Sequence, residues 1–293
     1  MTLFQTGIDV SSHQGAIDWA KVKADGTAFA ILRAGYGRYR SQEDKRFAEY
    51  YRACEENGIQ TGAYWYSYAQ SPAEAVQEAE TAMAVLKGKR FGYPIYYDVE
   101  DRTQLALSKT QLQRIVQSFC GTLEENGWFA GLYSYKSFLL ANFSEELLQR
   151  YAVWVAHTGV SETNYPLSYG VWQYSHSGTV QGIRGAVDKN HAYLNYPVIM
   201  QQRGVNGYPS VAEVNPYTIP TVPVRYGDSG EEVRWLQWEL TNHGFPCGPS
   251  GIDGNFGPAT RTALLAYQAA NGLAADGVCG PATRASFMVS PDK

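Results

Sequence analysis

Short apolar runs alternate with amphipathic segments over the first 200 residues of the chain. The apolar runs are rich in aromatic and β-branched residues and end at turn residues, which is typical of buried strands; they cover 6–15, 28–37, 60–69, 93–100, 128–135, 152–159 and 169–175. Between them, 71–89 and 108–127 have the apolar spacing of helices, the second behind a Ser108–Gln111 capping box. This order predicts an α/β fold in which parallel strands, wrapped by helices, form a barrel or a barrel-like sheet.

The pattern changes after residue 200. Residues 201–224 lack helical or strand periodicity and gather prolines toward their end, which is typical of a semi-extended linker. We therefore expect three parts: a barrel of residues 1–200, the linker 201–224, and a second domain of residues 225–293.

The second domain contains an internal repeat. The motifs "DGNFGPATR" at 253–261 and "DGVCGPATR" at 276–284 each predict a turn followed by the first turn of a helix. Ahead of them, 228–244 is an amphipathic helix that we expect to open with a Ser229–Glu232 capping box. A calcium loop is the alternative for D-G-x-x-G, but too few oxygen ligands follow at the required spacing, so a turn is favoured.

Composition narrows the classes of function. With 293 residues, 44% hydrophobic and 18% charged, the chain is long enough for one large and one small globular domain. The net charge of -4 is spread thinly, and no region is basic enough for a nucleic-acid partner or an anionic membrane surface. No run of 18 apolar residues exists, so we predict no membrane span. The 22 Tyr, 7 Trp and 11 Phe suit either core packing or stacking against sugars.

The start "MTLFQTGIDV" lacks the basic and apolar regions of a signal peptide. The expectation is a protein made in the cytoplasm without a secretion signal, or one whose signal has been lost. Of the 4 Cys, Cys54 and Cys120 lie in helix-like segments and are expected to be buried thiols. Cys247 and Cys279 either pair, which would stabilise a small domain, or remain free; both alternatives stay open.

Four acidic residues fall near the ends of predicted strands. Asp98 and Glu100 close the run 93–100, Asp9 lies at the end of the first strand, and Asp188 follows the last short apolar patch. Alone, an aspartate at a strand end usually caps a turn. Asp98 and Glu100, however, are two residues apart and so share one face, about 6–7 Å apart along the strand. Hydrolytic acid catalysis or a metal site explains such a pair.

A metal site is the weaker of these two explanations. The sequence has no HExxH motif, no paired CxxC and no convergent set among its 5 His. We therefore predict no metal and no cofactor.

Six motifs occur in a diagnostic order: "GIDVSSHQGAIDW", "TGAYWYS", "YYDVE", "VWVA", "VWQYS" and "VDKN". In this order they resemble the family 25 glycoside hydrolases, the Chalaropsis-type lysozymes of phages, bacteria and fungi, over about residues 5–200. The resemblance implies hydrolysis of the β-1,4 bond between N-acetylmuramic acid and N-acetylglucosamine in peptidoglycan. Trp65 stands where many relatives carry His, which bears on substrate contacts.

The resemblance also implies the site residues. It places Glu100 as general acid, Asp98 as partner carboxylate, Asp9 and Asp188 as flanking acids, and Tyr64, Tyr66 and Gln173 as cleft-lining residues. The chemistry agrees, because a poor leaving group needs a protonated acid near neutral pH and crowded acids raise one another's pKa. For Asp98 we favour orientation of the substrate's 2-acetamido group, with a nucleophile or a base for water as the alternatives.

The C-terminal segments "GDSGEEVRWLQ", "GIDGNFGPATRTALLAYQ" and "NGLAADGVCGPATR" resemble the peptidoglycan-binding domain type 1 over residues 225–288. This resemblance implies a small all-α three-helix domain that tethers the enzyme to bacterial peptidoglycan and raises the local substrate concentration. The oligomeric state is not predicted.

Two alternatives to a modular muramidase remain. One is an N-acetylglucosaminidase or chitinase, which uses the same D-x-E logic; the other is a wall-binding protein without catalysis. The absent signal favours a phage endolysin released by a holin over a secreted bacterial autolysin.

Overall fold

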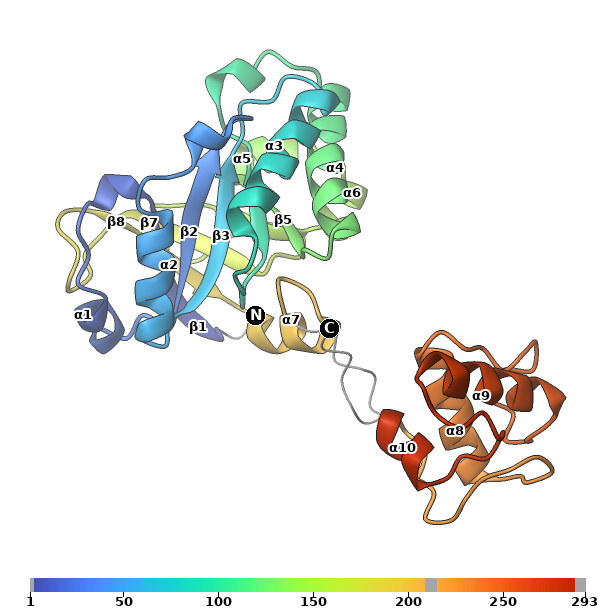
Figure 1. Ribbon diagram of the computed structural model, residues 1–293. Coiled ribbons are helices and arrows are strands. Elements are labelled where there is room, and N and C mark those ends of the chain that lie inside the picture. Colours follow the sequence, from blue (N-terminus) through green and yellow to red (C-terminus); the bar gives the residue numbers. More distant parts are fainter. Residues whose placement is uncertain (1–2, 209–214, 288–293) are drawn as a thin grey trace. The chain divides into compact units, whose positions relative to one another are not determined.

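The computed structural model describes residues 3–208 and 215–287, and the chain divides into two compact units, Met1–Val211 and Ala212–Lys293 (Figure 1). The first unit is mixed α/β and the second is helical. No helix in these described ranges is long and apolar enough to cross a membrane.

Eight strands close into a barrel in chain order. The strands are β1 (Gln5–Val10), β2 (Phe29–Tyr36), β3 (Gln60–Tyr66), β4 (Ile95–Asp98), β5 (Ala130–Tyr135), β6 (Ala152–Ala156), β7 (Val171–Gly178) and β8 (Val187–Ala192). This confirms the predicted α/β barrel-like fold. Neighbours from β1 to β7 are parallel, but β8 is antiparallel to both β7 and β1, so the expectation of an all-parallel sheet is wrong. The sequence of β8, "VDKNHA", is too polar to have been recognised as a strand.

Helices surround the barrel, and the last of them packs Tyr196 and Met200 against the inner core. They are α1 (Trp19–Ala24), α2 (Phe47–Glu56), α3 (Pro72–Leu86), α4 (Lys109–Glu125), α5 (Lys136–Asn142), α6 (Glu145–Arg150) and α7 (Tyr196–Arg203), with short 3-10 turns at Ser12–Gln14, Arg40–Gln42 and Arg102–Gln104. The two predicted helices are confirmed as α3 and α4, and α4 opens with the predicted Ser108–Gln111 capping box.

Alternating strand residues build two separate cores. On β4, Tyr96 points into the barrel and packs against Trp154 at a ring distance of 5.2 Å. Its neighbour Tyr97 points outward and stacks on Phe119 of α4 at 3.7 Å. Asp98 then points inward again, so the barrel interior is filled by aromatic rings up to the mouth, where the carboxylates begin.

The C-terminal unit contains α8 (Glu231–Asn242), α9 (Pro258–Ala270) and α10 (Pro281–Phe287), which confirms the three-helix prediction. Its core includes Leu236, Leu264 and Tyr267. The predicted Ser229–Glu232 capping box does not form. The N-cap of α8 is Gly230 instead, and glycine has no side chain that could accept a hydrogen bond from the first turn.

Of the two alternatives for Cys247 and Cys279, the structure shows free thiols. Cys247 and Cys279 are both buried and unbonded, as are Cys54 and Cys120. Burial raises the pKa of the Cys247 thiol to about 11 and that of Cys279 to about 12.

The first repeat forms a turn that is locked by a buried glutamine of the preceding helix. Gln237 of α8 donates from Nε2 to Asp253 Oδ1 at 2.8 Å, to the Asn255 carbonyl at 3.1 Å and to Thr260 Oγ1 at 3.0 Å. Its Oε1 accepts the Gly254 N–H at 2.8 Å. Every polar atom of this amide is therefore paired.

The second repeat reproduces the lock atom for atom. Gln268 of α9 donates to Asp276 Oδ1, the Val278 carbonyl and Thr283 Oγ1 at 2.9, 3.0 and 3.2 Å, and accepts the Gly277 N–H at 3.0 Å. The aspartate of each repeat is thus held by amide donors. This arrangement favours the turn over a calcium loop.

Candidate active site

The four predicted acids meet at one mouth of the barrel. Asp9 is near the end of β1, Asp98 ends β4, and Glu100 follows two residues later. Because β8 runs in the opposite direction, its beginning lies at the same mouth, and Asp188 is the register partner of Asp9. The four carboxyl groups line one pocket of about 190 Å³.

Most of the predicted site lies in this pocket, which we call the catalytic pocket. Its lining consists of Asp9, Tyr64, Asp98, Glu100, Tyr133, Tyr135, Trp154, Thr158, Gln173, His176 and Asp188. Tyr66 is not among them; it donates a hydrogen bond to Asp101 Oδ2 at 3.2 Å and lines the neighbouring pocket with Tyr36 and Tyr68.

Asp9 is held by a network of oriented amides. Its Oδ2 accepts from Gln173 Nε2 at 2.9 Å and from Asn190 Nδ2 at 2.7 Å. Tyr133 donates its hydroxyl to Gln173 Oε1 at 3.0 Å, and Trp154 donates its indole N–H to Asn190 Oδ1 at 2.8 Å. These donors fix both amides with their nitrogen atoms toward Asp9, so Gln173 orients an acid in addition to lining the cleft.

Asp9 and Asp188 lie opposite each other on neighbouring strands and line the same pocket. Burial, and then the charge of Asp188, raises the pKa of Asp9 well above its usual range, while burial also raises the pKa of Asp188. Neighbouring carboxylates disfavour each other's ionisation, so negative charge on both acids at once is costly here.

Asp98 and Glu100 both hold protons more tightly than exposed carboxyl groups. Burial raises the pKa of Asp98 well above its usual range, assisted by the charges of Glu100 and Asp9. Burial also raises the pKa of Glu100, against a hydrogen bond from Tyr135, and the charge of Asp188 adds to the rise. Burial is thus the leading cause for both, rather than the crowding of Glu100 by Asp98 expected from the sequence.

Each of these two acids, which line the catalytic pocket, also has an unpaired oxygen. Asp98 Oδ1 and Glu100 Oε2 are buried and have no hydrogen-bond partner among the residues that the structure describes. Buried polar atoms are nearly always paired, so unpaired oxygens on neighbouring acids indicate places where a ligand supplies the missing donor.

Sequence reasoning missed several residues of this pocket. Tyr133 and Tyr135 occupy alternate positions of "YSY" at the end of β5, the same spacing that drew attention to Asp98 and Glu100. Asn190 sits two residues after Asp188 on the strand that was not recognised.

Trp65 lies outside the cleft. It is buried in the outer core and donates its indole N–H to the Gly37 carbonyl at 2.8 Å. The departure from His at this position therefore affects packing behind the sheet and not the lining of the catalytic pocket.

Comparison with known proteins identifies both units. Residues 8–183 match the model of the glycosyl hydrolases family 25, and residues 229–286 match that of the putative peptidoglycan binding domain. The autolytic lysozyme of Clostridium acetobutylicum is 28% identical over 271 residues, which cover 91% of this chain and 74% of that protein.

Solved structures give the same assignment for the barrel. The bacterial lysozyme from Streptomyces coelicolor matches with a TM-score of 0.60 and 26% identity, covering 71% of this chain and 100% of that one. The modular autolysin LytC from Streptococcus pneumoniae, solved in complex with a synthetic peptidoglycan ligand, matches with a TM-score of 0.58 and 30% identity. That match covers 64% of this chain but 46% of LytC, so this chain spans less than half of that autolysin. The chain belongs to the glycosyl hydrolases of family 25 and is a muramidase by family, with a peptidoglycan-binding domain at its C-terminal side.

Proposed function

We propose that Glu100 and Asp98 carry the reaction of this muramidase, hydrolysis of the β-1,4 bond between N-acetylmuramic acid and N-acetylglucosamine in peptidoglycan. The observation that supports this assignment is the pair of unpaired, buried oxygens, Asp98 Oδ1 and Glu100 Oε2, in one pocket. A glycosidase needs two such carboxyl groups beside the scissile bond, one to donate a proton and one to assist at the anomeric carbon.

Glu100 acts as the general acid. Its pKa is raised by burial, which keeps the carboxyl group protonated at a pH where an exposed glutamate has lost its proton. As the bond between the anomeric carbon and the glycosidic oxygen breaks, the Glu100 proton passes to that oxygen, and the leaving sugar departs as an alcohol. The resulting carboxylate then takes a proton from the attacking water.

Asp98 assists through the substrate. Its unpaired Oδ1 accepts the N–H of the 2-acetamido group, whose carbonyl oxygen attacks the anomeric carbon and forms a cyclic oxazolinium ion. A hydrogen bond from the acetamido N–H favours the ionised form of Asp98, which offsets the rise in pKa caused by burial. The negative charge on Asp98 in turn favours the protonated form of Glu100. Substrate binding thus distributes the proton as the reaction requires.

Asp9 and Asp188 give electrostatic support. Both line the catalytic pocket, where negative charge favours the developing positive charge of the sugar ring, while burial and the charge of Asp188 disfavour ionisation of both acids at once. Tyr64 contributes an aromatic wall, with its ring 6.0 Å from that of Trp154.

The C-terminal unit anchors the enzyme to the wall. We place the catalytic domain in the first 200 residues and the anchor at 225–293, which includes the family match at 229–286. The linker predicted at 201–224 begins too early, because α7 continues to Arg203 and Asn206 is hydrogen-bonded to Tyr93 and Phe129 of the barrel domain. Deletion of 225–293 should leave hydrolysis of soluble glycan fragments unchanged and slow the lysis of whole walls, because tethering raises the local concentration of substrate. Equal loss on both substrates would contradict this role.

The test of the reaction is the identity of the new chain ends. Purified peptidoglycan is digested, reduced with borohydride and examined by mass spectrometry, and reduced muramic acid ends are expected. Reduced glucosamine ends would show an N-acetylglucosaminidase on the same scaffold. The absence of new ends, with wall binding retained, would leave a binding protein.

A further inference from the structure

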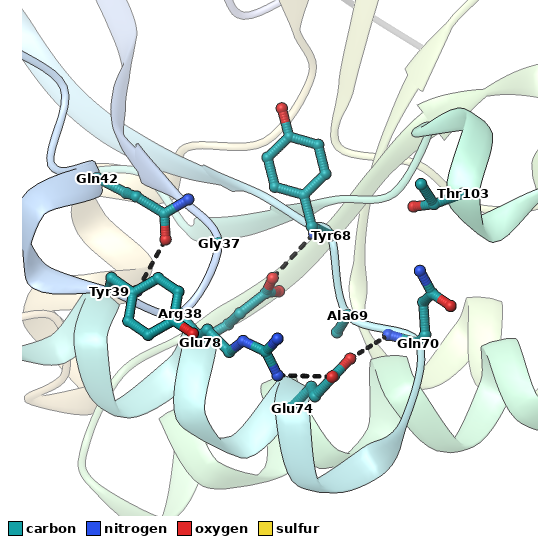
Figure 2. Close-up of a pocket in the computed structure, with 10 residues that line it drawn as sticks. All are labelled: Gly37, Arg38, Tyr39, Gln42, Tyr68, Ala69, Gln70, Glu74, Glu78 and Thr103. Carbon is teal, nitrogen blue, oxygen red and sulfur yellow. Dashed lines mark hydrogen bonds and ion pairs between the residues drawn. The ribbon is translucent and has the colours of Figure 1, made fainter.

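A buried carboxylate on α3 lies outside the catalytic pocket. Glu78 is 1% exposed, and each of its oxygens accepts one hydrogen bond. Oε1 accepts the backbone N–H of Tyr68 at 2.9 Å, and Oε2 accepts the hydroxyl of Tyr97 at 2.6 Å (Figure 2 shows the first of these bonds). Burial of a carboxylate is costly unless it is well paired, so this position calls for a role.

Glu78 terminates a directional chain of hydrogen bonds. Gln104 donates from Nε2 to Ser67 Oγ at 2.8 Å and to the Ala69 carbonyl at 3.0 Å. Ser67 donates to the hydroxyl of Tyr97 at 2.8 Å, and Tyr97 donates to Glu78. The chain begins at an amide donor and ends at a group that only accepts, which fixes the direction of every bond between them.

This chain ties together three segments around the end of β4, the strand that carries Asp98. Ser67 and Ala69 lie in the loop that follows β3; Tyr97 directly precedes Asp98 on β4; and Gln104 ends the turn that follows Asp101. The same loop is held a second time from α3, because Glu74 accepts the N–H of Gln70 at 2.8 Å while it is paired with Arg38 at 2.6 Å (Figure 2).

The loop presents Tyr68 beside the catalytic pocket. Tyr68 is 42% exposed, and its ring lies 5.2 Å from that of Tyr66 and 6.1 Å from that of Tyr36. The three rings line a pocket of about 540 Å³. Tyr66 of β3 is the register partner of Asp98 of β4, so this tyrosine cluster lies next to the strand that carries Asp98.

We propose that Glu78 is a positioning residue: by fixing the Tyr68 backbone it holds the ring of Tyr68 as a contact surface for the glycan chain next to the cleaved bond. The proposal rests on the proposed function, since it concerns the same substrate. Sugar rings stack on aromatic faces only when those faces are held in place, because ordering a mobile loop on binding costs free energy.

The first test is Glu78→Gln in the full chain, assayed on soluble glycan fragments. The amide has nearly the same shape but brings an N–H₂ group against one of two donors, so it either loses the Tyr68 N–H or forces the Tyr97 hydroxyl to accept, which reverses the directed chain to Ser67 and Gln104. We expect KM to rise about tenfold with kcat little changed, since the contact is made equally with the bound substrate and the transition state. Glu80→Gln is the matched control, because Glu80 is exposed on the same helix, and its KM should stay at the wild-type value.

Tyr68→Ala makes the test independent of folding. This exposed residue can be truncated without disturbing the core, and the same rise in KM is expected. The double variant Glu78→Gln/Tyr68→Ala should have the same KM as either single variant, because both substitutions remove the same interaction with the glycan. Additive effects on KM, or a Glu78→Gln enzyme that is less stable but has an unchanged KM, would overturn the proposal.

The wild-type enzyme in the same assay separates this proposal from the proposed function. If the wild type produces no new muramic acid ends, the proposed function fails. If it cleaves, and Tyr68→Ala keeps the wild-type KM, only the positioning role is wrong.

Discussion

The barrel mouth and the C-terminal unit both bury polar side chains, but they pair them to different extents. In the C-terminal unit, Gln237 and Gln268 are 1% exposed and each amide is fully hydrogen-bonded to the turn that follows its helix. At the mouth, Asp98 and Glu100 each keep a buried oxygen without a partner in the described part of the chain.

This difference is expected between polar groups that build the fold and polar groups that act on a ligand, although Gln104 Oε1 and the Trp19 indole N–H of the barrel unit are also buried without a partner in the described residues. A fully paired amide contributes stability and offers nothing to a ligand, so the glutamine locks explain the repeated motif without locating the wall-binding surface. An unpaired buried oxygen costs about 1–3 kcal/mol, a cost that is recovered when substrate supplies the donor. Functional sites commonly carry such a loss of stability.

The largest effect is expected at Glu100. Glu100→Gln removes the transferable proton at nearly constant shape, so activity on peptidoglycan should fall by about 10²- to 10⁴-fold. The free energy of unfolding should be unchanged or higher, because the amide is neutral in a buried, acidic pocket. Counting new muramic acid ends and measuring thermal unfolding of the same sample checks both expectations; activity within tenfold of the wild type would remove Glu100 from the role of acid.

An intermediate effect is expected in the C-terminal unit. Gln237→Leu leaves the Gly254 N–H, Asp253 and Thr260 without their partner, and should destabilise this unit by about 2–3 kcal/mol. Gln268→Leu should behave alike, since its lock is the same. Denaturant unfolding reports the loss, while hydrolysis of soluble fragments should not change. If both variants have the same free energy of unfolding as the wild type, the hydrogen bonds of Gln237 and Gln268 do not stabilise the repeats.

The sequence predicted features that depend on local patterns. The barrel followed from alternating strands and helices, and the three-helix unit followed from helix-starting turns at 253–261 and 276–284. The Asp98–Glu100 pair was visible because strand periodicity places i and i+2 on one face. Each of these inferences uses neighbours within a few residues.

Features that depend on distant pairing were not predictable in the same way. The reversed direction of β8 brings Asp188 and Asn190 to Asp9, about the whole length of the barrel domain away in sequence. Likewise, Gln237 meets Asp253 only after α8 and the repeat have packed. A polar strand such as "VDKNHA" has no apolar pattern to reveal it, because one of its buried positions is Asn190, which bonds to Asp9 and Trp154 of other strands.

The smallest effect is expected at Asp9, whose Oδ2 is paired by two amides and whose pKa is raised by burial and then by the charge of Asp188. Asp9→Asn mimics the protonated acid, since the amide is neutral and its oxygen can still accept from Gln173 and Asn190. In the wild type, the pKa of Asp9 in the folded protein lies above the unfolded value of about 3.9. The contribution of Asp9 to the free energy of unfolding is therefore fully present below that pH and is lost as the pH rises through the folded pKa.

The variant should therefore approach the stability of the wild type at low pH and exceed its free energy of unfolding at neutral pH, with a shallower dependence on pH between these values. Denaturant unfolding of both proteins across this range measures the slope. A variant that is less stable than the wild type at neutral pH would mean that Asp9 is ionised in the folded protein. The distinction drawn between the paired acid Asp9 and the unpaired acids Asp98 and Glu100 would then no longer hold.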